Sequence, residues 1–255
     1  MISVLIPVYN FDIRSLITDL LQQIKSLNIA VELIVVDDLS EPHFKNLNNQ
    51  VGDIKEIKYI LSEEKLGRNA IRQKMATIAS FENLLFIDCD SKIINDQYLA
   101  KYIDQIQNSY SVIVGGRIYY AKKPSSCIKV LHWKYGTYRE SQPFQKRKLH
   151  PHHNFMTNNF LIKKEIFLSL KYDENIKGYG HEDTYMGIQL EEKQVPVTHI
   201  DNPVIHLGVE DCDVFIQKSM EALKNMFHLE SVLPKEQLKK HIKLYRYYSL
   251  LQSFH

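Results

Sequence analysis

The sequence predicts an α/β fold in which a mostly parallel sheet is flanked by helices. Short apolar runs alternate with amphipathic stretches over the first two fifths of the chain, a pattern typical of successive right-handed β-α-β units. Several of these runs are apolar at consecutive positions, as in strands that are covered on both faces. The chain has 255 residues, 44% of them apolar, which is enough to bury a large core.

The first half of the chain supplies most of this expected sheet. Strands are predicted over residues 2–6, 31–36, 57–61, 84–87 and 111–114. Helices are predicted over residues 14–27, 69–80 and 96–106, because apolar residues recur there on one helical face.

The second half is more varied. We expect a helix over residues 128–138, a mobile loop over 145–153, a strand over 159–163 and a helix over 183–192. Short strands are expected over 195–200 and 204–207, followed by amphipathic helices over 211–229 and 235–254. This organisation predicts a ligand-binding half over residues 1–116, a second half of the same domain over 117–210 and a C-terminal helical extension over 211–255.

Charge and cysteine content narrow the classes of function. Eight lysines and arginines but only one acid, Glu140, lie between Lys122 and Lys148. This excess of positive charge predicts an anionic partner, either a phosphate-bearing substrate or a membrane surface. The three cysteines are widely spaced, which indicates a reducing compartment. Neither a basic leader nor a run of transmembrane length is found, so we expect a cytoplasmic protein.

Acidic residues follow two of the predicted strands. Asp88 and Asp90 close the apolar run 84–87, and Asp37 and Asp38 close the run 31–36. Such a pair alone is also found in ordinary turns. Carboxyl ends of parallel strands meet at one edge of a sheet, where open α/β sheets bind ligands. Oxygen ligands suit a divalent cation that also contacts phosphate, so the sequence predicts a nucleoside-diphosphate site.

Several short motifs, taken in order, resemble the family 2 glycosyltransferases of the GT-A fold, which has a Rossmann-like sheet. They are Pro7-Val8-Tyr9-Asn10, Val35-Val36-Asp37-Asp38, Gly67-Arg68-Asn69 with Arg72, Asp88-Cys89-Asp90, Thr157 to Ile162, Gly178 to Asp183, and Val204 to Gly208. The resemblance spans roughly residues 1–210 and leaves the last helices outside it. One departure is Leu39, which stands where the family more often has glycine after the acid pair, so a different turn is expected there.

The resemblance implies roles for individual residues on the donor side. Donor-binding roles fall on Pro7, Tyr9, Asp38, Arg68, Arg72, Asp88 and Asn159. Tyr9 and Asp38 would hold the base, and Asp88 would reach the ribose. Asp90 and His206 would bind Mn²⁺ or Mg²⁺, which screens the departing diphosphate. For His206 an alternative stays open, that of an ordinary histidine satisfied within the core.

On the acceptor side, the resemblance implies an inverting transfer that needs a general base. Asp183 would take the proton of the acceptor hydroxyl, with Glu182 as the adjacent alternative. Acidic residues at a helix start are also ordinary helix caps, which is the competing interpretation of both.

Two basic segments have open interpretations. His150, His152 and His153 lie in a Lys/Arg-rich stretch without nearby carboxylates or cysteines, so we expect them in a loop facing the acceptor or a phosphate rather than in a metal site. That loop is otherwise a solvated connector. The basic helix 235–254 either lies on an anionic membrane or packs on its own domain.

The function implied by the resemblance is a metal-dependent, inverting hexosyl- or N-acetylhexosaminyl-transferase. Its donor would be a nucleoside-diphosphate sugar, with UDP favoured, and its acceptor a glycan or lipid-diphosphate-linked hydroxyl in surface-polysaccharide biosynthesis. Peripheral contact with the inner face of the cell membrane is expected, and nucleic acid is not an expected partner. The alternatives are a nucleotidyltransferase, which needs a Gly-rich loop where Val8 to Asp12 stand, and a non-catalytic module that binds anionic ligands or nucleic acid.

Overall fold

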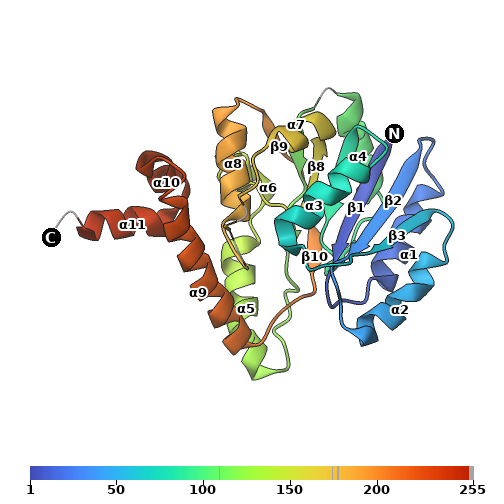
Figure 1. The fold of residues 1–255 in the computed structure, drawn as a ribbon, viewed down its shortest axis with the longest axis horizontal. Helices are drawn as coiled ribbons and strands as arrows, with labels where there is room; N and C mark the ends of the chain where they lie inside the picture. Colours follow the sequence, from blue (N-terminus) through green and yellow to red (C-terminus); the bar gives the residue numbers. More distant parts are fainter. Residues whose placement is uncertain (109, 174, 177, 253–255) are drawn as a thin grey trace.

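The fold is a central seven-stranded sheet with helices on both faces (Figure 1). This computed structural model describes residues 1–108, 110–173, 175–176 and 178–252. The sheet has the order β3-β2-β1-β4-β8-β6-β9. Its strands are β1 Ile2–Val8, β2 Val31–Asp37, β3 Ile57–Leu61, β4 Asn83–Ile87, β6 Val112–Val114, β8 Asn159–Lys163 and β9 Val197–His199.

The sheet is parallel except at β8, which runs antiparallel to both β4 and β6. Because β1, β2, β3 and β4 are parallel, the carboxyl ends of β2 and β4 lie at the same edge. The mostly parallel α/β fold is therefore confirmed, and the predicted bounds of β3 and β8 are those observed.

Helices bury their apolar sides against the two faces of the sheet. On one face lie α1 Arg14–Ile24, α2 Pro42–Gly52 and α4 Tyr98–Gln107, which share a core with β1. On the other face lie α3 Gly67–Ile78, α7 Lys164–Ser169 and α8 Glu182–Glu192. The sequence analysis did not identify α2 or α7.

A second, three-stranded sheet adjoins the large sheet at the carboxyl end of β4. It has the order β5-β10-β7, formed by β5 Ser91–Lys92, β10 Val204–His206 and β7 Arg117–Ile118. In the expected helix 128–138 the structure has a 3₁₀ turn Cys127–Lys129, then α5 Val130–Tyr135 and a π-helical turn Gly136–Glu140.

The prediction of a mobile loop over residues 145–153 is partly wrong. Its first residues belong to the short helix α6 Phe144–Arg147, and Arg147 is only 3% exposed. The Arg147 guanidinium donates to the carbonyls of Gly115 and Ile200 at 2.9 and 3.0 Å. The Arg147 side chain, one of the charges that suggested a solvated loop, thus holds this basic segment against the protein interior.

The C-terminal extension consists of three helices rather than two. Helix α9 spans Cys212–Leu229, α10 spans Lys235–His241 and α11 spans Lys243–Gln252. The predicted single helix 235–254 is broken at Ile242, whose backbone is extended, and its last residues lie outside the described chain. These helices have a small core of their own and run from α5 to the end of the molecule opposite β2 and β3 (Figure 1). Within the described residues, none of the helices is both long enough and apolar enough to cross a membrane.

Candidate functional site

Asp90 and His206 meet where the small sheet adjoins the large one. The antiparallel pairing of β5 with β10 sets His206 opposite Ser91, and the Leu207 amide donates to the Asp90 carbonyl at 2.8 Å. As a result, Nδ1 of His206 lies 3.3 Å from Oδ1 of Asp90. Burial acts to raise the pKa of Asp90, but His206 and then Arg117 lower it below its usual range. The carboxylate is therefore ionised.

The residues around Asp90 fit a divalent cation. Asp90 Oδ1 is buried, and its 3.3 Å contact with His206 Nδ1 lacks the geometry of a hydrogen bond. This oxygen therefore has no hydrogen-bond partner in the described part of the chain, although such an atom normally has one. Gly208 keeps the space beside it open, since a Cβ there would lie 2.3 Å from Asp90 Oδ2. A carboxylate oxygen with an imidazole nitrogen is a donor set that Mn²⁺ accepts.

Asp183, the second residue of α8, is held from one side only. Its Oδ1 accepts from Thr157 Oγ1 at 2.5 Å and from the Thr157 amide at 3.3 Å, which leaves Oδ2 without a hydrogen-bond partner among the described residues. Burial and the neighbouring Glu182 carboxylate raise the pKa of Asp183 to about 6. A carboxylate with a free oxygen and such a pKa can act as a general base near neutral pH.

Glu182 is engaged differently. Its Oε1 accepts from Arg68 Nη1 at 2.9 Å, and the residue is only 6% exposed. Burial acts to raise the pKa of Glu182, but the Arg68 cation lowers it overall. The Arg68 guanidinium also lies over the Tyr179 ring, 4.7 Å from its centroid. Arg68 therefore faces the acidic start of α8.

Arg72 and Asp88 form a second ion pair at this edge of the sheet. Arg72 Nη2 lies 2.6 Å from Asp88 Oδ1, and the Arg72 side chain is 5% exposed. The Asp88 amide donates to the carbonyl of Asn158 at 2.9 Å. This pair links α3 to the end of β4 and holds Asp88 close to the strands rather than in solvent.

Asp38 holds the start of α3. Its two oxygens accept from the amides of Leu66 and Gly67 at 2.6 and 3.0 Å, as in the capping of a helix N-terminus. Lys65 lies 3.5 Å from Asp38 and places its Nζ 2.8 Å from the centroid of the half-exposed Tyr9 ring.

The turn after Asp38 is built without the glycine that the family favours. Leu39 has a φ of +58°, a left-handed conformation that non-glycine residues rarely adopt. Leu39 itself therefore adopts a backbone conformation that glycine adopts more readily. Pro7 lies in β1 opposite Val36, two residues before Tyr9 on the same edge.

Asn159 does not join these residues, although the sequence resemblance placed it on the donor side. It is fully buried and lies in a network of four partners. Its Oδ1 accepts from the hydroxyls of Tyr98 and Tyr102 at 2.8 and 2.6 Å. Its Nδ2 donates to the carbonyls of Gly116 and Asn202 at 2.9 Å each. In this structure it ties β8 to α4 and to the turn after β6.

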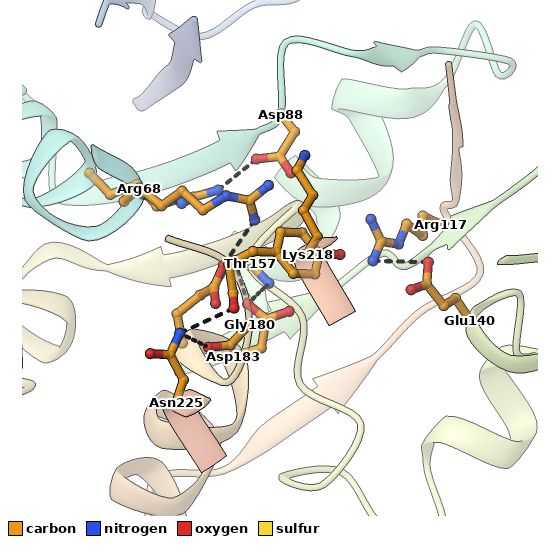
Figure 2. Close-up of polar contacts among 12 residues, drawn as sticks. Arg68, Asp88, Arg117, Glu140, Thr157, Gly180, Asp183, Lys218 and Asn225 are labelled. Atoms are coloured by element: carbon orange, nitrogen blue, oxygen red, sulfur yellow. Dashed lines mark hydrogen bonds and ion pairs between the residues drawn. The ribbon is translucent and has the colours of Figure 1, made fainter. Parts of the chain in front are cut away.

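The sequence analysis missed the contribution of the C-terminal helix α9. Asn225 Nδ2 donates to the carbonyls of Tyr179 and Gly180 at 3.1 Å each, and Figure 2 shows Asn225 beside Gly180. Gly180 has a φ of +99°, and a Cβ on it would lie 2.5 Å from the Cβ of Ala222. The loop before Glu182 and Asp183 is thus seated against α9. The glycines gave a signal for a tight loop, but nothing in the sequence linked them to residue 225.

A basic hollow of about 210 Å³ opens beside the site. Its lining includes Arg117, Arg139, Glu140, Gln142, Arg147 and Asn154. Arg117 Nη2 lies 3.1 Å from Glu140 Oε2, and Tyr119 donates to the same carboxylate oxygen at 2.6 Å. Arg117 Nε is buried without a partner among the described residues, so this guanidinium retains a hydrogen that a ligand can accept.

The sequence matches the model of the family described as "Glycosyl transferase family 2" over residues 3–170. Among curated proteins, none matches this sequence.

Several solved structures share the fold, and three are described here. Glucosyl-3-phosphoglycerate synthase from Mycobacterium tuberculosis, in complex with Mn²⁺, UDP and glucosyl-3-phosphoglycerate, has a TM-score of 0.58 and 16% identity over 89% of this chain and 79% of its own. TarS residues 1–349 from S. aureus has a TM-score of 0.57 and 17% identity, over 86% and 64%. The mannosyltransferase PcManGT from Pyrobaculum calidifontis, in complex with GDP-Man and Mn²⁺, has a TM-score of 0.59 and 13% identity, over 90% and 64%. At these identities the likeness establishes the GT-A fold.

Proposed function

Since the chain belongs to glycosyl transferase family 2, we propose that it is a metal-dependent, inverting transferase that uses a nucleoside-diphosphate sugar. The observation that carries this proposal is that two carboxylates, Asp90 and Asp183, are in different protonation environments. Arg117 lowers the pKa of both Asp90 and Asp183, so its charge acts on both. The first is ionised beside His206, whereas the second has the raised pKa of a base. The two alternatives from the sequence, a nucleotidyltransferase and a nucleic-acid-binding module, gain nothing from the family match.

On the donor side, Asp90 and His206 would hold Mn²⁺ or Mg²⁺. When bound, such a cation neutralises the diphosphate as it leaves. The nucleotide complexes of the mycobacterial and archaeal enzymes with Mn²⁺ support this assignment. UDP is our first choice, as in the mycobacterial complex.

The nucleobase of the donor would bind at the edge of the sheet where Tyr9 and Asp38 lie. For a nucleobase to stack on the half-exposed Tyr9 ring, the Lys65 ammonium must first move off that ring. Lys65 can do so because its side chain is 48% exposed. Asp38 then contributes by holding the start of α3, and Arg72 does so by holding Asp88. Pro7 would contribute backbone contacts.

On the acceptor side, Asp183 is the base that we propose. Its Oδ2 is free to accept the proton of the acceptor hydroxyl while Thr157 fixes Oδ1. Glu182 is the positioning residue, because its pair with Arg68 fixes the start of α8 and its negative charge raises the pKa of Asp183. Attack from the side opposite the leaving diphosphate inverts the anomeric centre.

The acceptor class follows from the basic hollow. Arg117 and Arg139 line it, and arginine side chains recognise phosphate and carboxylate groups. We therefore propose an anionic acceptor, a glycan or a lipid-diphosphate-linked sugar, in surface-polysaccharide assembly. The transferred group would be a hexosyl or N-acetylhexosaminyl unit. Residues 1–116 would bind the donor and residues 117–210 the acceptor.

A membrane-bound acceptor agrees with the exposed face of α11. Leu244, Tyr247 and Leu251 recur on one side of this helix and are 53%, 61% and 68% exposed, beside Lys243 and Arg246. A basic helix with such an apolar side lies at the surface of anionic bilayers. We propose peripheral contact with the inner face of the cell membrane through α11.

A thermal-shift panel of UDP, GDP, CDP and dTDP, each with and without Mn²⁺, tests the donor assignment. A ligand that binds only the folded protein raises its melting temperature. We expect one nucleotide, UDP first, to raise it by several degrees with Mn²⁺ and by much less without. No shift with any of the four in the presence of Mn²⁺ would contradict the proposed function.

A further inference from the structure

Three chain segments bring two histidines and a glutamate together at the end of the molecule that carries the C-terminal helices. His153 follows α6, Glu191 lies near the end of α8, and His241 is the last residue of α10. One ligand atom from each lies within 4.8 Å of the other two. The sequence offered no carboxylate beside the histidines at 150–153, but the fold supplies one from 38 residues further along the chain.

We propose that His153, Glu191 and His241 form a binding site for a transition-metal ion, with Zn²⁺ as its preferred occupant. Two imidazole nitrogens and a carboxylate oxygen are a common ligand set for zinc, with water in the fourth position. This site is separate from the one at Asp90. Glu191 lies eight residues after Asp183 on α8, about 12 Å further along the helix.

The side chains are close enough to converge. Two ligand atoms that each lie about 2.1 Å from a tetrahedral zinc are roughly 3.4 Å apart. The observed spacing of up to 4.8 Å therefore has to shrink by little more than 1 Å. His153 can move because it is exposed, whereas His241, whose side chain is 1% exposed, already lies 2.9 Å from Glu191 Oε2.

The ring packing also favours metal binding. The imidazoles of His153 and His241 lie with centroids 4.1 Å apart, and His150 stacks on His153 at 5.5 Å. Rings so close repel each other when protonated. The neutral imidazole is the form that binds metal, so this close packing disfavours the protonated form that would compete with a metal ion.

Glu191 has a competing partner, since Lys240 and His241 both contact its carboxylate. Lys240 Nζ lies 2.7 Å from Glu191 Oε2, and its side chain is 52% exposed, so a metal ion can displace it into solvent. Next to the cluster, His152 Nε2 donates to the carbonyl of Val195 at 2.9 Å, and His152 Nδ1 lies 4.0 Å from Glu191 Oε1.

A bound metal ion would link α10 of the C-terminal extension to α8 and to the segment after α6. Its ligands come from the segment after α6, from α8 and from α10, and α8 also carries Glu182 and Asp183 at its other end. Imidazole ligands favour Zn²⁺, Ni²⁺ or Cu²⁺ over Mg²⁺ and Mn²⁺, so the two sites would select different ions. This inference does not depend on the proposed transfer reaction.

The test is a competition titration of Zn²⁺ against a chromophoric chelator, with the full chain. We expect one tight zinc equivalent in the wild type. His153→Ala, which removes an exposed ligand, should weaken it by about 100-fold. His43→Ala, an exposed histidine on α2, is the matched control and should leave the affinity unchanged. Lys240→Gln removes the competing cation and should raise the affinity several-fold.

Two further measurements separate this site from the one at Asp90. Saturating zinc should raise the melting temperature by roughly 5 °C in the wild type and in His206→Ala, but not in His153→Ala. Co²⁺ should give the intense visible absorption of a four-coordinate site in the same two proteins. Equal zinc affinity in the wild type and His153→Ala, or loss of the effect in His206→Ala, would overturn the proposal.

Discussion

Arg68 Nη1 lies 2.9 Å from Glu182 Oε1, so a guanidinium on α3 is joined to the first residue of α8. This pair fixes the acidic helix start and engages Glu182. The adjacent Asp183 keeps a free oxygen and a raised pKa. Two neighbouring carboxylates thus have different environments, and such differences are what separate acid-base roles in active sites.

The first prediction concerns Asp183. Asp183→Asn should lower the turnover number by about 10²- to 10⁴-fold because the general base is lost. Nucleotide binding, measured by calorimetry, should stay within twofold of the wild type because the donor site is untouched. Glu182→Gln is the comparison variant and should lose about tenfold, since the helix start is loosened but the base remains. Near-normal turnover in Asp183→Asn would refute the base assignment.

The second prediction is a pH dependence. Asp183 acts as a base only when deprotonated, and its pKa is raised to about 6. The rate under saturating substrates should therefore be constant above pH 7 and fall about tenfold per unit well below pH 6. In Glu182→Gln, the loss of the neighbouring negative charge lowers the pKa of Asp183, so the acid limb should move to lower pH. An unmoved limb would show that another group titrates.

The third prediction separates a structural role of Asn159 from a donor-binding one. Asn159→Ala leaves two tyrosine hydroxyls and two carbonyls without this partner inside the protein. It should lower the free energy of unfolding by about 3 kcal/mol or more, measured by urea denaturation. Asn158→Ala is the matched control, because the buried Oδ1 of Asn158 has no partner among the described residues, and its cost should be smaller. Equal stability of both variants would contradict the network.

The fourth prediction concerns the seat of the glycine loop on α9. Asn225→Ala removes the hydrogen bonds to the carbonyls of Tyr179 and Gly180. The loop before Asp183 should loosen, and the turnover number should fall about tenfold because the base is less well positioned. Nucleotide affinity should not change. Lys224→Ala, at an exposed position on the same helix, should behave as the wild type, and a matching loss there would point to a general effect on α9.

Local patterns predicted the first half of the fold well. Strand β3 is an apolar run ended by turn residues, and the acids after β2 and β4 lie at the same edge of the sheet because β1 pairs in parallel with both strands. The pairing of His206 with Asp90 was predicted only through the family resemblance. In the structure it depends on the register of β10 with β5, which a single sequence does not reveal.

Contacts between segments that are far apart in the chain could not be predicted from the sequence. Arg147 belongs to a run of cations, and nothing local indicates that its guanidinium donates to the carbonyls of Gly115 and Ile200, directly after β6 and β9. The break at Ile242 is equally hidden, because Leu238 and Tyr245 continue a helical apolar pattern across it. Glu191 and His241 reach His153 only through the packing of α10 on α8, which explains why no metal site was predicted there.

The central claim is that Asp90 and His206 hold a cation that binds the donor diphosphate. Calorimetric titration of the nucleotide selected by the thermal-shift panel, with and without Mn²⁺, tests it in the wild type and in Asp90→Ala. We expect Mn²⁺ to strengthen binding at least tenfold in the wild type and to have no effect in Asp90→Ala. Binding that Mn²⁺ strengthens equally in both proteins would contradict the account.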